Sequence, residues 1–143
     1  MKAKYNSLDF SKKVIHLTNE KGFFITNLQL QKVLYYLQGA YMKNYNKKAF
    51  DEEIECWPYG PVVKSVWKEY SVYGRAPIRG VISTLQLSQD EEDVILNVIK
   101  EKLSMYVWDL VDQTHSEFPW KTAFENGKSV ISDKDMKEFF CNE

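Results

Sequence analysis

The segment around residue 115 contains two side chains that could transfer protons. His115 and Glu117 stand two residues apart in a turn that Pro119 stiffens, and Trp120 follows directly. A histidine and a carboxylate within one turn can act as general acid and general base. The same pattern is typical of helix capping, in which Ser116 or Glu117 binds free backbone N–H groups of the next helix. We favour capping and keep acid–base hydrolysis as an alternative.

Other catalytic chemistries find less support in the residue types and their spacing. The two cysteines and two histidines lack the paired spacing that structural zinc sites show. A nucleophilic pair of Cys56 and His115 would need a local motif that the chain does not have. The NGKS sequence at 126–129 ends like a phosphate-binding loop, but position 122 lacks the required glycine. We therefore predict no catalytic residue, no metal site, no cofactor and no enzymatic activity.

A rigid aromatic corner at residues 57–61, with the sequence WPYGP, offers binding rather than catalysis. Two prolines and a glycine restrict the backbone and hold the rings of Trp57 and Tyr59 near a surface. The corner is either a structural anchor between two layers or a recognition surface. Pro61 also suits the first position of a helix, which we expect to run to about residue 71.

Acidic side chains precede this corner. From Phe50 to Trp57, apolar and acidic residues alternate, which predicts a short strand with one buried face. Asp51, Glu53 and Glu55 lie on one side of that strand. Because several carboxylates are not buried without partners, we expect them to form an exposed acidic edge. Such an edge would suit a basic groove on a partner protein.

The strongest signals for secondary structure predict a long helix over about 27–45. Thr26 and Gln29 form a capping box at its start, and apolar residues then recur at helical spacing. With a rise of about 1.5 Å per residue, the helix would be roughly 30 Å long and suits the centre of a small domain. A polar stripe follows another face, made of Gln31, Tyr35 and Gln38. It is either the polar shoulder of a core helix or the lining of a partner groove.

The remaining pattern is mostly helical. Further cap signals are Ser7, Ser88 with Glu91, and Ser132 with Asp135. A weak alternation near 81–86 predicts a second strand that pairs with residues 52–57. The sequence predicts a mainly α protein, one domain over residues 1–143, with about six to seven helices around the helix at about 27–45. At most a minor two-stranded β-ribbon is expected, near 52–57 and 81–86.

Charge is distributed unevenly along the chain of 143 residues, whose formal net charge is −1. Residues 1–50 carry nine lysines and two carboxylates, whereas the rest carries ten basic and eighteen acidic side chains. The start has no apolar stretch of the signal-peptide kind, and no apolar run of about 18 residues could span a membrane. We expect a cytoplasmic protein with two free thiols.

The basic first half supports one alternative function. It mixes lysines with tyrosines, namely Lys32, Lys43, Lys47, Lys48, Tyr35, Tyr36, Tyr41 and Tyr45. Such a mixture could follow a nucleic-acid backbone and stack on bases. However, no arginine precedes Arg75, and arginine is the usual reader of bases. A nucleic-acid-binding regulator is therefore the alternative and not the main hypothesis.

Three separated stretches resemble one known family. They are LQLQKVLYYLQGAY at 28–41, FDEEIECWPYGPVV at 50–63 and THSEFPW at 114–120. With the closing ISDKDMKEFF, they resemble the Panacea domain of SocA-like and GepA-like phage-associated proteins, and the similarity covers Lys12 to Phe140. The chain departs from the family at Lys64, often proline, at Cys56, often a small residue, and in the connection over 75–87.

The resemblance implies a mostly helical antitoxin of a type II toxin–antitoxin pair, often borne on a prophage, that neutralises a toxin protein by direct contact. The residues that match the family motifs, and that are candidates for partner binding, are Trp57, Tyr59, His115, Glu117 and Trp120. The polar stripe and the acidic edge are further candidates. Whether the motif residues contact the toxin or hold the fold is open, and we favour the fold. The sequence assigns no oligomeric state.

Overall fold

The computed structural model describes residues 1–142 as seven α-helices, one 3-10 helix and five short strands. In chain order these are β1 (Ala3–Tyr5), α1 (Ser7–Glu20), α2 (Asn27–Tyr45), β2 (Lys48–Phe50), β3 (Ile54–Trp57), β4 (Gly60–Val62), α3 (Lys64–Glu69), η1 (Ser71–Tyr73), α4 (Gln89–Leu103), α5 (Val107–Ser116), α6 (Phe118–Glu125), β5 (Val130–Ile131) and α7 (Asp133–Cys141). The predicted mainly helical fold is confirmed. None of the helices in this part of the chain combines the length and apolar character that crossing a bilayer requires.

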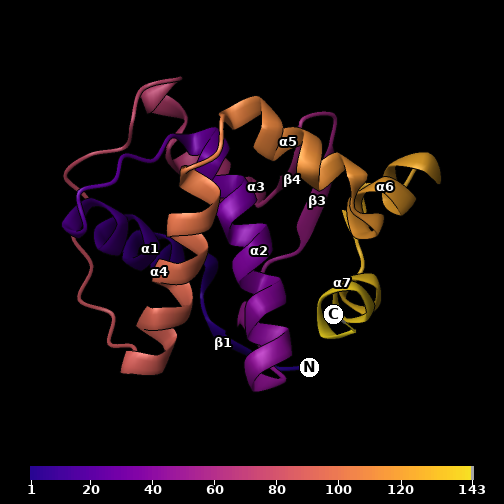
Figure 1. Cartoon of the computed structure of the whole chain (residues 1–143), viewed down its shortest axis with the longest axis horizontal. Coiled ribbons are helices and arrows are strands. Elements are labelled where there is room, and N and C mark those ends of the chain that lie inside the picture. Colours follow the sequence, from indigo (N-terminus) through magenta and orange to yellow (C-terminus); the bar gives the residue numbers. More distant parts are fainter. Residues whose placement is uncertain (143) are drawn as a thin grey trace.

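Helix α2 is the centre of the molecule, as predicted. It lies between α1 and α4 on one side and α6 and α7 on the other, with α5 across its upper end (Figure 1). It packs against α7, α4, β2 and β4, and every residue from 30 to 39 is buried. A helix that is surrounded in this way must bury polar side chains as well, and each of them then needs a hydrogen-bond partner.

Local capping signals were read correctly at three of four helix starts. The capping boxes at Thr26 and Ser88 are both formed, and Ser132 accepts a hydrogen bond from the backbone N–H of Asp135. The prediction for Ser7 is wrong, because Asn6 caps α1. Its side chain accepts hydrogen bonds from the backbone N–H groups of Leu8 and Asp9. Ser7 is buried, and its hydroxyl donates to Glu52 at 2.7 Å.

The acidic stretch does not form the continuous strand that its alternation predicted. It divides into β2, which pairs in parallel with β1, and β3, which lies between antiparallel β4 and β5. The interruption falls at Glu52, whose carboxylate turns inward and accepts hydrogen bonds from Ser7 and from the backbone N–H of Ser65 at 2.9 Å. A half-buried carboxylate needs such donors, and its hydrogen bonds hold the chain in a bend between β2 and β3.

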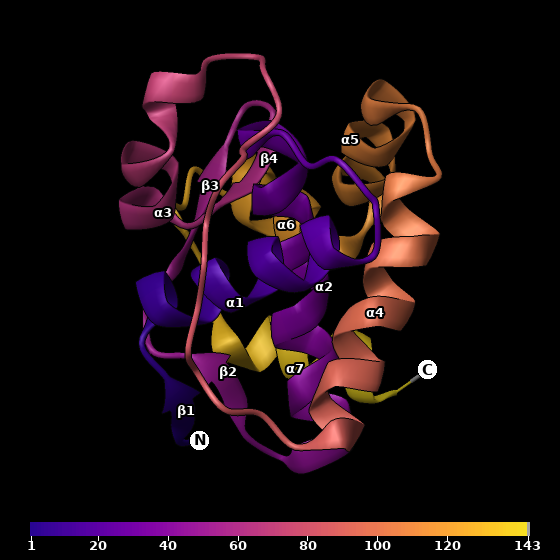
Figure 2. The same cartoon turned by 90° about the vertical axis from the view of Figure 1, so that its left-hand side faces the viewer.

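The second strand expected near 81–86 is absent, and the partners of β3 are β4 and β5 instead. The connection over 74–88 runs along α1 from the end of η1 to the start of α4 (Figure 2). Burial does alternate along 81–88, as the sequence indicated. The inward side chains rest on helices, and His16 of α1 accepts the backbone N–H of Ser83 at 2.9 Å. The alternation of apolar and polar residues over 81–86 therefore indicated an extended segment with one buried side, and not a strand of a sheet.

The helix expected to begin at Pro61 begins three residues later. Residues Gly60–Val62 form β4, at the edge of the three-stranded sheet, and α3 starts at Lys64. An edge strand tolerates proline because one of its sides makes no ladder hydrogen bonds. Gln31 accepts the backbone N–H of Val63 at 2.8 Å, which holds this segment extended against α2.

Candidate functional site

The two family-like motif turns meet and form one unit, which we call the motif corner (residues 57–61 and 114–120). The indole N–H of Trp120 donates to the carbonyl oxygen of Trp57 at 2.9 Å. The ring of His115 stacks on the ring of Trp120, with centroids 4.1 Å apart. Cys56 adds a weak contact, with its thiol 3.7 Å from the carbonyl oxygen of Trp120. Elements far apart in the chain are therefore fixed together at this corner.

Within the motif corner, the aromatic side chains differ in what they expose. Trp120 is buried and Trp57 is half-buried. The indole N–H of Trp57 donates a hydrogen bond to the Glu55 carboxylate, and its ring packs edge-on against Trp67 at a centroid distance of 6.0 Å. Tyr59 is 62% exposed, and its ring contacts Trp108 of α5 at a centroid distance of 6.1 Å. Of the two rings predicted to present themselves, the structure therefore presents Tyr59 fully and Trp57 only in part.

Glu117 links α2 to α5 and does not cap α6 as expected. Its carboxylate accepts hydrogen bonds from the hydroxyls of Tyr35 and Tyr36 at 3.1 and 3.0 Å, and from Gln113 at 3.4 Å. No side-chain hydrogen bond caps α6, although Glu117 occupies its N-cap position. Burial raises the pKa of Glu117, and the hydrogen bonds from the two tyrosines oppose that rise. The capping interpretation of Glu117 is wrong because these hydroxyls compete for the carboxylate.

His115 has surroundings separate from those of Glu117. Its Nε2 atom is buried with no hydrogen-bond partner among the described residues. Burial lowers the pKa of His115, a hydrogen bond with the backbone of Pro58 raises it, and the nearby charge of Lys32 lowers it further. The net direction is down, so the ring is neutral near pH 7. Since the two side chains have different partners, the geometry does not support an acid–base pair made of His115 and Glu117.

Lys32, one of the lysines of the nucleic-acid alternative, lies beneath the motif corner. The side chain is fully buried, and its ammonium group donates to the carbonyl oxygen of Pro61 at 3.0 Å. Burial lowers the pKa of Lys32 from 10.5 to about 7. Its spacing along α2 gave no signal of this burial, because every residue from 30 to 39 is buried whatever face of the helix it lies on.

Gly60 is required where the corner approaches Lys32. Its φ of +111° is one that other residues rarely adopt, and a Cβ there would lie 2.8 Å from Thr114 Oγ1 and 3.0 Å from Lys32 Nζ. The WPYGP sequence therefore has a structural reason at this position. It lets the backbone pass over a buried ammonium group.

Lys32 should make the protein more stable as pH rises above about 7. Because its folded pKa of about 7 lies below the ordinary 10.5, the unfolded chain binds more protons between those values. Stability should rise across that window by up to about 1.4 kcal/mol per pH unit. Urea unfolding of wild type and Lys32→Met between about pH 7 and 9.5 measures it. Parallel curves for the two proteins would contradict this assignment.

Lys64→Met is the matched control for that series, since Lys64 is exposed. It should keep the wild-type dependence on pH. His115 does not disturb the window, because its pKa is lowered from 6.5 and it stays neutral throughout.

The polar stripe on α2 lies inside the protein. Gln31 and Tyr35 are fully buried, and Gln38 is 2% exposed. Gln38 accepts the backbone N–H of Ala49 at 2.7 Å and donates to the carbonyl oxygen of Phe50 at 3.0 Å, so that it holds β2. The stripe therefore ties strands to the central helix, and we do not propose that it contacts a partner.

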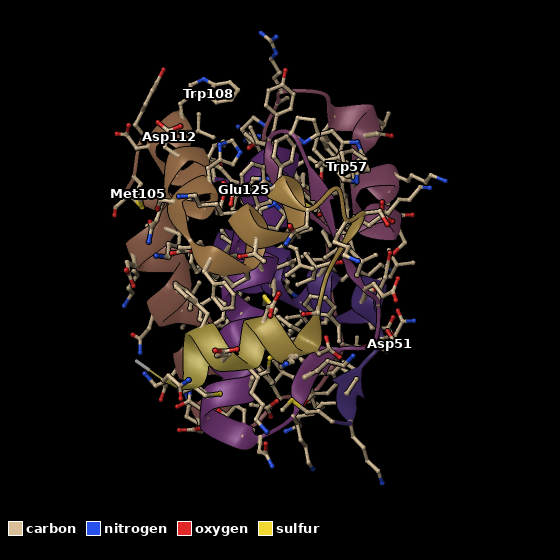
Figure 3. The ribbon with its side chains drawn as sticks, turned by 90° about the vertical axis from the view of Figure 1, so that its right-hand side faces the viewer. Asp51, Trp57, Met105, Trp108, Asp112 and Glu125 are labelled. Atoms are coloured by element: carbon tan, nitrogen blue, oxygen red, sulfur yellow. The ribbon has the colours of Figure 1, made fainter. Side chains whose placement is uncertain are left out.

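The acidic edge is partly exposed, and only its last residue, Glu55, contacts the motif corner. Asp51 and Glu53 are exposed, whereas Glu55 is half-buried and accepts from Trp57. Figure 3 shows Asp51 in the lower half of the molecule, while Trp57 and Trp108 lie in its upper half. We therefore do not expect one partner to contact Asp51 and Glu53 together with the exposed rings of Tyr59 and Trp108.

Half of the residues proposed for nucleic-acid binding are buried in the core. Lys32, Tyr35, Tyr36 and Tyr41 are all buried, so they cannot follow a phosphate backbone or stack on bases. Residues 1–142 also contain no group of three or more His, Cys, Asp or Glu side chains that could hold a metal ion.

Comparison with known proteins gives a consistent result. The model of the family described as "Antitoxin SocA-like, Panacea domain" matches residues 30–121, a span that holds both motif turns. The chain is similar to Antitoxin SocA of Caulobacter vibrioides (strain NA1000 / CB15N), with 29% identity over 136 residues that cover 81% of this chain and 72% of the relative. No solved structure matches it significantly.

Proposed function

The chain belongs to the family of SocA-like antitoxins with a Panacea domain, and we propose that it neutralises a cognate toxin by binding it directly. The family supports an antitoxin role. Beyond that role, we propose that neutralisation occurs by direct contact between the two proteins, as in a type II system. We further propose that residues 1–143 act as one domain and that the pair works in the cytoplasm.

One observation carries the proposal. A corner fixed by the Trp120–Trp57 hydrogen bond and by ring stacking presents Tyr59 to solvent, beside Trp108, which is 46% exposed. Tyrosine and tryptophan are enriched among the residues that dominate binding energy at protein interfaces. Rings on a stiff support also lose little conformational freedom on binding, which favours affinity. A binding role accounts for two exposed rings that contact each other on this stiff support.

Co-expression with the neighbouring open reading frame tests the proposal. We expect the neighbour alone to arrest growth, and co-expression of this chain to restore growth and to yield a complex that co-purifies through size exclusion. A chain with Gly60→Val, which cannot form the corner because of the crowding at Lys32 and Thr114, should fail to rescue. Rescue without any complex would contradict direct binding.

A further inference from the structure

A groove lies beside the motif corner, where four segments meet. It is formed by the start of α2, by α3, by the chain that follows η1 and by the start of α5, and its volume is about 540 Å³. The residues that give it its character are Leu28, Tyr59, Trp67, Arg75, Val107 and Trp108. Tyr59 is the one residue of this group that the sequence also marked as a candidate for partner binding.

The walls of the groove are apolar and aromatic. Tyr59 and Trp108 form one rim, with their rings 6.1 Å apart, and both are substantially exposed. Trp67 also lines the groove, and its ring packs edge-on against that of Trp57. Covering solvent-exposed aromatic rings with a partner is favourable, because it removes apolar surface from water. Indole and phenol rings bind apolar side chains in this way.

The groove carries a positive charge, which distinguishes between possible apolar partners. Arg75 is the only charged residue in its lining, and no carboxylate of the described residues lines it. Helix α2 also begins here and has no acidic side chain in its first turn to offset the positive end of its dipole. Asp109 and Asp112 of α5 are exposed, but they lie outside the lining. The groove therefore favours an occupant that carries a carboxylate.

We propose that this groove is the toxin-docking site, and that it takes a toxin segment whose apolar side chains enter between Tyr59, Trp67 and Trp108 while an acidic residue pairs with Arg75. The inference rests on the proposed function and adds the surface and the chemistry of the partner to it. A mixed apolar and acidic segment fits because the apolar walls supply affinity and Arg75 supplies orientation.

Binding of the purified product of the adjacent open reading frame, measured by calorimetry, tests the docking site. Tyr59→Ala, Trp108→Ala and Arg75→Glu should each weaken binding by about tenfold or more, because truncated anchors and reversed rim charges have effects of this size. Arg75→Gln should weaken binding less than Arg75→Glu and should also reduce the dependence of affinity on salt.

Controls of the same chemical kind lie elsewhere on the surface. Val72 and Ile82 are 86% and 72% exposed and outside the groove, so Val72→Ala and Ile82→Ala should bind like wild type. The thermal midpoint of each groove variant should stay close to that of wild type, since the altered side chains are partly solvated. This condition separates lost contact from lost folding.

Each outcome has a distinct meaning. If wild type neutralises and binds, but all three groove variants bind within about twofold of wild type, the docking site is wrong and the proposed function stands. If wild type neither binds nor rescues, the proposed function fails and the docking site with it. If the free chain is a dimer that Trp108→Ala separates into monomers, the occupant is a second copy of this chain, and the toxin assignment is overturned.

Discussion

Replacing Glu91 with alanine should lower the free energy of unfolding by about 3 to 5 kcal/mol, since it removes one partner of a buried, hydrogen-bonded charge network. Glu91 is 3% exposed, and its carboxylate accepts from the hydroxyls of Tyr5 at 2.7 Å and Tyr41 at 3.0 Å. Lys4 lies 3.1 Å away as its ion-pair partner. The variant would leave the buried hydroxyl of Tyr41 unpaired and would loosen β1 from α4.

The same network predicts how stability responds to acid. Burial by itself would raise the pKa of Glu91, but hydrogen bonds from Tyr5, the Ser88 backbone, Lys4 and Tyr41 outweigh burial and lower it to about 2. Because the folded value lies below the ordinary one, the stabilisation is complete above about pH 4.5 and is lost as pH falls towards 2.

Chemical denaturation of wild type, Glu91→Ala and Asp93→Ala at neutral pH measures the effect. Asp93 is the matched control, because it is an exposed acid on the same helix, and its removal should cost less than about 0.5 kcal/mol. A loss below about 1 kcal/mol for Glu91→Ala would show that the network adds little to stability.

Gly39→Val should destabilise the protein by about 3 kcal/mol or more, because added atoms in a packed contact force neighbouring elements apart. A Cβ at Gly39 would lie 2.3 Å from two carbons of the Phe140 ring. One of these is Cγ, the ring carbon bonded to Cβ, so a flip of the ring about the Cβ–Cγ bond cannot relieve the contact. Only a change of the Phe140 rotamer about Cα–Cβ, or a shift of α7, can do so. Helix propensity acts in the opposite direction but is weaker, since glycine costs about 1 kcal/mol relative to alanine within a helix. Crowding between α2 and α7 should dominate.

A double-mutant cycle tests this crowding. The variant Gly39→Val with Phe140→Ala should lose less stability than the sum of its two single variants, because valine then enters the space of the missing ring. Ala40→Val is the control, since residue 40 is next to Gly39 but only half-buried. Strictly additive losses would mean that Phe140 moves aside freely, and that α7 is not held by this contact.

Much of the helical framework was readable from the sequence. Thr26 caps the central helix α2 and Ser88 caps α4, and each capping box involves only four consecutive residues. The family-like motifs at 57–61 and 114–120 were also readable as a pair. Their contact through Trp120 and Trp57 gives that pairing its physical meaning.

Local patterns failed where a distant residue competed for the same atoms. Glu117 looked like a cap, but two tyrosine hydroxyls from α2 occupy its carboxylate. Alternation over 81–86 looked like a strand, but the chain lies on α1. In both places the pattern described burial or polarity correctly, while the partner came from another part of the chain.

The sequence by itself determined the mainly helical class, the long central helix, the rigid corner and the family, because caps, periodicity and turn residues act over a few neighbours. The tertiary structure alone decided which polar side chains are internal and which rings stay exposed. Lys32 sits beneath Gly60, whereas Tyr59 and Trp108 meet at a groove beside Arg75. Burial depends on what packs against each face, and sequence spacing does not contain that information.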